Sequence, residues 1–159
     1  HQHRISTLIT RNLYGTLSGK KIVILGFAFK SNTNDTRESA SIQICKDLIE
    51  EGAILFIHDP KVSCEQISKD LGKKDSHCNN GKEGSWEFIL DLNESFKDAD
   101  AIVILTEWEE YNNLDWFNIA KIMRQPAWVF DSRSITNPIK ISNSGIKLWR
   151  IGDGSIKNN

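Results

Sequence analysis

Two cations stand in a polar segment that links an apolar run to an expected helix, and such a segment is suited to binding phosphate. Lys30 lies in the middle of this segment, and Arg37 is expected in the first turn of the helix. A cation at that position opposes the helix dipole and costs up to about 1 kcal/mol unless an anion joins it. Free N–H groups at a helix N-terminus, with an arginine added, bind phosphate readily. The alternative is that Arg37 pairs locally with Asp35 or Glu38 and that Lys30 is solvated.

Further polar side chains follow other apolar runs that we expect to be strands. With Lys30, Glu107 and Arg133 come at the carboxyl ends of three such runs. Ligands of open parallel sheets bind at that edge, so we predict a binding cleft there. Arg133 can meet a phosphate or ribose held by the first loop, an interaction worth roughly 1.5–3 kcal/mol. It can also merely pair with Asp131.

The first loop lacks the G-x-G-x-x-G signature of dinucleotide sites. After Gly26 the chain continues Phe-Ala-Phe-Lys, without the second glycine that lets backbone approach a pyrophosphate. Asp59 ends the second apolar run, where a ribose-binding acid would sit, but it lies too far along the chain and precedes Pro60. We interpret it as a turn-former. An ordinary NAD pocket is therefore not expected.

Neither catalysis nor metal binding has a convincing set of residues. Cys45 falls on a core-facing helix position, Cys64 in a first turn and Cys78 in a loop, and all three are interpreted as inert thiols. His77 and Cys78 are the only close pair of soft ligands, and we predict no metal site there. An odd number of cysteines without C-x-x-C spacing suits a reducing compartment.

The composition indicates one domain of an intracellular protein. The chain has 159 residues and a formal net charge of −1, which argues against a nucleic-acid binder. No apolar run approaches the roughly 20 residues needed to span a bilayer, so a cytoplasmic location without membrane contact is expected. Trp108, Trp116 and Trp128 are interpreted as core or interface aromatics rather than as base-stacking platforms.

The elements that must position these residues alternate between strands and helices. Apolar runs predict strands at 22–25, 54–57, 86–89, 101–105, 127–130 and 147–151. Capped or amphipathic segments predict helices at 4–14, 36–51, 63–71, 92–97 and 114–123, the second opened by a capping box of Asp35 and Glu38. This alternation requires crossover connections and predicts an α/β fold, a doubly wound, Rossmann-like parallel sheet of five or six strands flanked by helices.

Several short motifs occur in an order and spacing typical of one known family. They are Gly-Phe-Ala-Phe-Lys at 26–30, Asp-Thr-Arg-Glu-Ser at 35–39, Asp-Pro-Lys at 59–61, Thr-Glu-Trp at 106–108 and Phe-Asp-Ser-Arg at 130–133. Together they resemble the C-terminal, nucleotide-sugar-binding domain of the UDP-glucose/GDP-mannose dehydrogenase family. The resemblance covers residues 4–152, and the Phe-Ala-Phe-Lys and Thr-Glu-Trp forms are closest to the branch that oxidises UDP-glucose to UDP-glucuronate.

The resemblance implies roles for four residues. Phe29, Lys30 and Arg133 would contact a UDP-sugar substrate. Arg37 would reach toward an NAD cofactor held mainly by an N-terminal domain, which would explain a cation placed against its helix dipole.

The resemblance also implies a domain organisation. Residues 1–17 would be the end of the connecting helix that mediates dimerisation in this family, residues 18–152 the UDP-sugar-binding domain and residues 153–159 a polar tail. The family's catalytic cysteine and NAD fingerprint do not occur in this sequence, so we expect it to be inactive alone and the full-length protein to be a homo-oligomer.

Three other assignments remain open from the sequence. Relatives acting on UDP-N-acetylmannosamine or GDP-mannose share the family's architecture. A non-catalytic nucleotide-sugar module that dimerises through its first helix would carry the same cations. A flavodoxin-like signalling domain would need an acidic cluster on the sheet edge, where this chain has Lys30 and Arg133.

Overall fold

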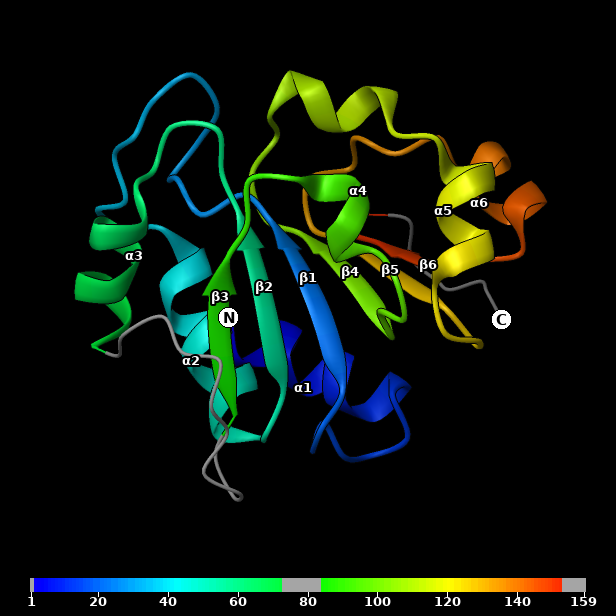
Figure 1. Cartoon of the computed structure of the whole chain (residues 1–159), viewed down its shortest axis with the longest axis horizontal. Coiled ribbons are helices and arrows are strands. Elements are labelled where there is room, and N and C mark those ends of the chain that lie inside the picture. Colours follow the sequence, from blue (N-terminus) through cyan, green and yellow to red (C-terminus); the bar gives the residue numbers. More distant parts are fainter. Residues whose placement is uncertain (1, 73–83, 153–159) are drawn as a thin grey trace.

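The computed structural model describes residues 2–72 and 84–152, which build a parallel sheet between two layers of helices (Figure 1). The strands are β1 (Lys21–Leu25), β2 (Ile54–His58), β3 (Ser85–Phe88), β4 (Ala101–Ile104), β5 (Trp128–Asp131) and β6 (Lys147–Arg150). All neighbours pair in parallel in the order β3-β2-β1-β4-β5-β6. This is the strand order of the doubly wound Rossmann fold, so the predicted fold class is confirmed.

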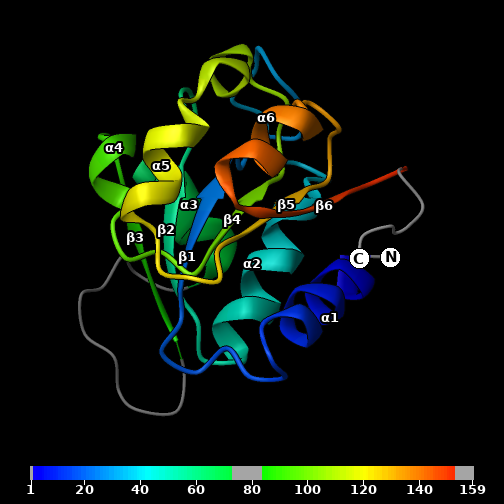
Figure 2. The same ribbon diagram turned by 90° about the vertical axis from the view of Figure 1, so that its right-hand side faces the viewer.

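The helices lie on both faces of the sheet. They are α1 (Gln2–Asn12), α2 (Ala40–Glu50), α3 (Cys64–Leu71), α4 (Leu92–Ser95), α5 (Trp116–Ile122) and α6 (Pro138–Ser144), with a 3-10 helix η1 (Glu109–Asn113). α1 and α2 cover one face, and α4 and α5 lie on the opposite face (Figure 2).

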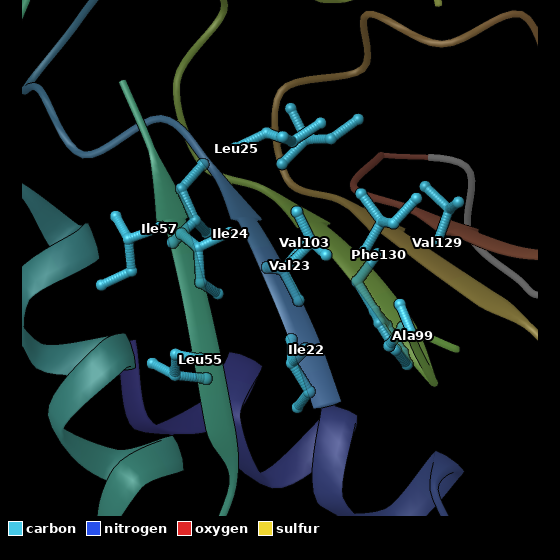
Figure 3. Packing of buried hydrophobic residues seen from close by; sticks show 14 of the residues in the cluster. Ile22, Val23, Ile24, Leu25, Leu55, Ile57, Ala99, Val103, Val129 and Phe130 are labelled. Carbon is cyan, nitrogen blue, oxygen red and sulfur yellow. The ribbon is translucent and has the colours of Figure 1, made fainter. Parts of the chain in front are cut away.

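The core is centred on β1, as its unbroken apolar sequence predicts. Ile22, Val23, Ile24 and Leu25 have no exposed surface, because β2 and β4 flank the strand and helices cover both faces. Figure 3 shows these side chains packing with those of the neighbouring strands. The central strands are therefore rigid, and the loops at their carboxyl ends start from fixed positions.

The first helix belongs to the packed body of the chain. Ile9 of α1 and Leu13, which directly follows the helix, are buried in the common core. At the surface, Asp47 of α2 accepts hydrogen bonds at Oδ2 from Ser6 (2.8 Å) and contacts Nδ1 of His3 (2.7 Å). Apolar burial and a polar link thus join α1 to α2.

The predicted start of α2 is wrong. Residue 36 and the proposed capping box of Asp35 and Glu38 lie outside the helix, and Glu38 has a left-handed φ of 61°. Ser39 is the N-cap instead, because its side chain accepts an N–H of the first turn. The sequence analysis missed Ser39, which lies next to the apolar stripe of α2.

The region after β4 also differs from the prediction. The expected helix over 114–123 is present as the shorter α5, whereas η1, which precedes it, and α6 were not predicted. Asn137 caps α6 by accepting N–H groups from Ile139 and Lys140, and Pro138 occupies its first turn. Asn-Pro is a recognisable helix start that could have revealed α6.

Candidate functional site

The candidate site begins where the strand order reverses between β1 and β4. Gly26 ends β1 with a φ of 101°, and a Cβ atom on it would lie 2.4 Å from Cβ of Thr106. Only glycine fits this close approach and this backbone conformation. The Thr106 hydroxyl then donates to the carbonyl of Ala28 at 2.9 Å. The chain leaving β1 is thereby fixed against the chain leaving β4.

Asp59, at the end of β2, is a second anchor of this loop. Its buried Oδ2 accepts the N–H groups of Phe27 (2.7 Å) and Ala28 (2.9 Å) and the indole N–H of Trp108 (3.1 Å). Its Oδ1 accepts two N–H groups of the following turn. The predicted turn-forming role is confirmed, but the sequence analysis missed that the same carboxylate holds the loops after β1 and β4.

The segment after Ala28 is a closed excursion of the chain, which we call the β1 loop (residues 29–35). The N–H of Phe29 donates to the carbonyl of Asp35 at 2.7 Å and closes it. Immediately beyond, the hydroxyl of Ser39 donates to the carbonyl of Phe27 at 2.9 Å. Lys30 is exposed on the β1 loop, and these hydrogen bonds hold the two ends of that loop.

Arg133, after β5, reaches across to the β1 loop. Its Nε donates to the carbonyl of Leu105 (2.9 Å), its Nη2 to the carbonyl of Phe29 (3.2 Å), and its Nη1 lies 3.2 Å from Oε1 of Glu107. Asp131 instead accepts the backbone N–H of Arg133 at Oδ1. The alternative in which the guanidinium merely pairs with Asp131 is therefore wrong.

The loops that follow β1, β4 and β5 meet at this edge of the sheet. Phe29 gives its carbonyl to Arg133, and Ser31 gives its N–H to Oε2 of Glu107 at 3.4 Å. Lys30 lies between these two residues, so its backbone is adjacent to the guanidinium. The side chain of Phe29 remains 41% exposed beside it. The group presents positive charge and an aromatic ring at the switch point of the sheet.

Arg37 does not lie where the helix prediction placed it. It precedes α2, and its guanidinium makes a bidentate contact with Asp35 at 3.0 and 2.9 Å. This pairing, chiefly the side-chain hydrogen bond, lowers the pKa of Asp35 to about 2. The alternative of local pairing with Asp35 is therefore the one that the structure shows. Arg37 does not lie in the first turn of α2, so it does not oppose the helix dipole there. Its side chain is 87% exposed, pointing away from the protein's own core.

The buried cysteine and the buried tryptophans belong to the core. Cys45 is fully buried, and burial raises the pKa of its thiol, so it is an inert core residue. Trp108 and Trp116 are core aromatics, as predicted. Across residues 2–72 and 84–152, no cluster of three or more His, Cys, Asp or Glu side chains could hold a metal ion, and His77 with Cys78 lies outside these ranges.

Within the same ranges, no helix has the length and apolar character needed to cross a membrane.

The strand order and the cationic loops at the switch point define a Rossmann-like domain of the kind that binds nucleotides at this edge. A family model described as the UDP binding domain of the UDP-glucose/GDP-mannose dehydrogenase family matches residues 23–138. The chain therefore belongs to the UDP-glucose/GDP-mannose dehydrogenase family, and it corresponds to the C-terminal domain of that family.

Relatives and solved structures agree with this assignment. UDP-glucose 6-dehydrogenase of Drosophila melanogaster is 41% identical over 152 residues, covering 95% of this chain and 32% of its own length. UDP-glucose 6-dehydrogenase 4 of Arabidopsis thaliana is 36% identical, covering 95% of this chain and 33% of its own length. The chain thus spans about a third of the length of these relatives.

Among solved structures, a UDP-glucose dehydrogenase from Pyrobaculum islandicum has a TM-score of 0.67 at 26% identity, covering 94% of this chain and 29% of its own. The NDP-N-acetyl-D-galactosaminuronic acid dehydrogenase from Methanosarcina mazei Go1 has a TM-score of 0.71 at 23% identity, covering 96% and 28%. The second comparison supports the fold alone.

Proposed function

We propose that this chain is the nucleotide-sugar-binding domain of an NAD-dependent dehydrogenase that oxidises UDP-glucose to UDP-glucuronate. The observation that carries the proposal is the Arg133 guanidinium held at the switch point of the sheet by the carbonyls of Leu105 and Phe29, the residue before Lys30. The relatives named UDP-glucose 6-dehydrogenase support UDP-glucose over the other sugars considered for this family.

In this proposal Phe29, Lys30 and Arg133 bind the UDP part of the substrate. A guanidinium has five N–H donors; hydrogen bonds to the carbonyls of Leu105 and Phe29 engage two of them, and Nη1 lies 3.2 Å from Glu107 as an ion pair. The remaining donors would bind diphosphate oxygens, and the ammonium of Lys30 would supply a mobile charge from the β1 loop. The exposed ring of Phe29 offers an apolar surface to the sugar or base.

The remaining parts of the proposal concern the whole protein. Arg37, exposed between the β1 loop and α2, would face the NAD held by an N-terminal domain and would share its charge between Asp35 and the cofactor. Residues 1–17 would be the end of the connecting helix, residues 18–152 the UDP-sugar domain and residues 153–159 a tail. The full-length protein would be a cytoplasmic homo-oligomer. The chain alone would not reduce NAD, because the family's catalytic cysteine motif and NAD fingerprint do not occur in this sequence.

Calorimetric titration of the 159-residue chain tests the proposal. UDP and UDP-glucose should bind, and GDP-mannose should bind more weakly. Lys30→Ala and Arg133→Ala should each weaken UDP binding by roughly 10- to 150-fold, the equivalent of about 1.5–3 kcal/mol for a charge-assisted hydrogen bond.

Lys46→Ala and Arg11→Ala are matched controls, since both side chains are exposed on α2 and α1, away from the carboxyl edge. Both controls should bind UDP as the unchanged chain does. Unaltered UDP affinity in Arg133→Ala would remove the basis of the proposal.

A further inference from the structure

An acidic side chain stands inside the proposed diphosphate site. Glu107 lies 3.2 Å from Arg133 through Oε1 and accepts the N–H of Ser31 at 3.4 Å through Oε2. Its side chain is 35% exposed, and that of Arg133 is 33% exposed, so both are partly accessible to solvent. A carboxylate at this place repels a diphosphate and partly neutralises the guanidinium that should attract it.

Arg133 does not need Glu107 to stay in position. The backbone carbonyls of Leu105 and Phe29 already accept two of its N–H groups, at 2.9 and 3.2 Å. Both carbonyls belong to segments fixed by the Thr106 and Asp59 hydrogen bonds. What Glu107 adds to this arrangement is chiefly its negative charge.

We propose that Glu107 is a specificity-determining residue that lowers the affinity of the site for anions that lack a nucleoside. With Lys30 and Arg133 it leaves a small net positive charge, so a phosphate group alone binds weakly and the nucleoside must contribute contacts. This inference rests on the proposed function, because it assumes that a nucleoside diphosphate occupies the site. The alternative is that Glu107 has a structural role and supports the β1 loop and Arg133 through its contacts with both.

Two substitutions separate charge from support. Glu107→Gln keeps the size of the side chain and one acceptor but removes the charge, whereas Glu107→Ala removes both. An effect of the Glu107 charge on affinity scales with the charge of the ligand and is screened by salt. An effect of lost structural support depends on neither the ligand charge nor the salt concentration. Pyrophosphate, UDP and uridine form a series in which the last carries no phosphate.

The experiment is calorimetric titration of this ligand series into the chain at about 0.01 M and about 0.15 M ionic strength, where the Debye length falls from about 30 to about 8 Å. Glu107→Gln should bind UDP and pyrophosphate about three- to tenfold more tightly at low salt, the effect of one unit charge several ångströms away in a wet site. The gain should shrink at the higher salt, and uridine binding should not change. Glu50→Gln, exposed on α2, is the control and should change nothing.

The outcomes distinguish the two proposals. Suppose that the unchanged chain binds UDP and that Arg133→Ala does not. If Glu107→Gln then binds UDP no more tightly than the unchanged chain, the charge role of Glu107 is refuted, while the proposed function still stands. If the unchanged chain binds neither UDP nor UDP-glucose, both proposals fall together. A gain for UDP and uridine alike would also refute the charge role.

Discussion

Arg37 and Asp35 illustrate how a local pair sets the charge of a loop. The guanidinium of Arg37 contacts both carboxylate oxygens of Asp35 and is still almost fully exposed. The carboxylate also accepts the backbone N–H of Arg37 at 2.9 Å, so the turn is held by backbone and side chain together. The loop therefore offers Arg37 outward in a defined orientation, as a partner domain or its cofactor would require.

The pair should be visible in the titration of Asp35. Its pKa is lowered from 3.8 to about 2 by the hydrogen bond from Arg37, so the folded form binds this proton less readily than the unfolded form. The contribution of the pair to stability is thus complete above the ordinary pKa and is lost as pH falls from about 4 toward about 2. In Arg37→Ala the pKa should return toward 3.8. Carboxyl ¹³C shifts followed against pH measure this directly.

Arg37→Lys is the comparison variant for that titration. A lysine keeps the charge but cannot make the forked contact, so the pKa of Asp35 should lie between the other two values. Equal Asp35 pKa values in the unchanged chain and in Arg37→Ala would contradict the pairing.

At the scale of the elements, the loops after three strands are tied to one another rather than to solvent. Tyr111 of η1 contributes another link, since its hydroxyl lies 2.8 Å from Nδ1 of His58 and donates to the carbonyl of the same residue at 3.2 Å. The hydroxyl thus links η1 to both the ring and the backbone of His58 at the end of β2. Burial lowers the pKa of His58 and raises that of Tyr111, so both are neutral near pH 7.

Among the residues that link one element to another, Asp59 is the one whose substitution should lower the unfolding free energy most. In Asp59→Asn an amide group replaces one of two oxygens that both face N–H donors, so at least one set of donors loses its acceptor. Hydrogen bonds to a charged group are worth about 1.5–3 kcal/mol, and the variant should lose roughly 2–4 kcal/mol of unfolding free energy. Urea denaturation followed by tryptophan fluorescence measures the loss.

Asp91→Asn is the matched control for this prediction. Asp91 caps α4 on the surface, where asparagine is an equally good N-cap, so the change should be a few tenths of a kcal/mol at most. Similar losses in the two variants would show that Asp59 is only a local turn residue.

The elements also show what a single sequence can and cannot disclose. The strands were predictable because a strand buried on both faces must be apolar throughout, as in β1 and β4. The meeting of Lys30, Glu107 and Arg133 followed from the rule that parallel strands end at one edge. The carbonyls that hold Arg133, and the N–H groups that reach Asp59, could not be predicted. Backbone direction after a strand depends on the tertiary path, not on residue type.

At the scale of the whole molecule, the site relies on local rather than overall charge. The chain has a formal net charge of −1, so long-range attraction contributes little to the binding of an anionic ligand. In the proposed function Lys30 and Arg133 would instead act at short range, and Glu107, 3.2 Å from Arg133, would reduce their attraction for the ligand. The α1–α2 layer lies on one face of the sheet (Figure 2), and the ligand edge is formed by the strand ends.

The position of α1 leads to a prediction about the stability of the whole chain. Ile9 has no exposed surface and packs in the core, although the resemblance assigns residues 1–17 to a connecting helix. If α1 unfolds together with the sheet, Ile9→Ala should lower the unfolding free energy by about 2–5 kcal/mol, the usual cost of such a truncation in a core.

Thr7→Ala, on the exposed side of the same helix, is the control, and its unfolding free energy should stay within about 0.5 kcal/mol of that of the unchanged chain. Urea denaturation of both variants tests this, with UDP affinity as a second readout that should not change because Ile9 is not among the strand-end residues. Equal denaturation midpoints for the two variants would mean that α1 is a separable segment and that the cooperative unit begins at β1.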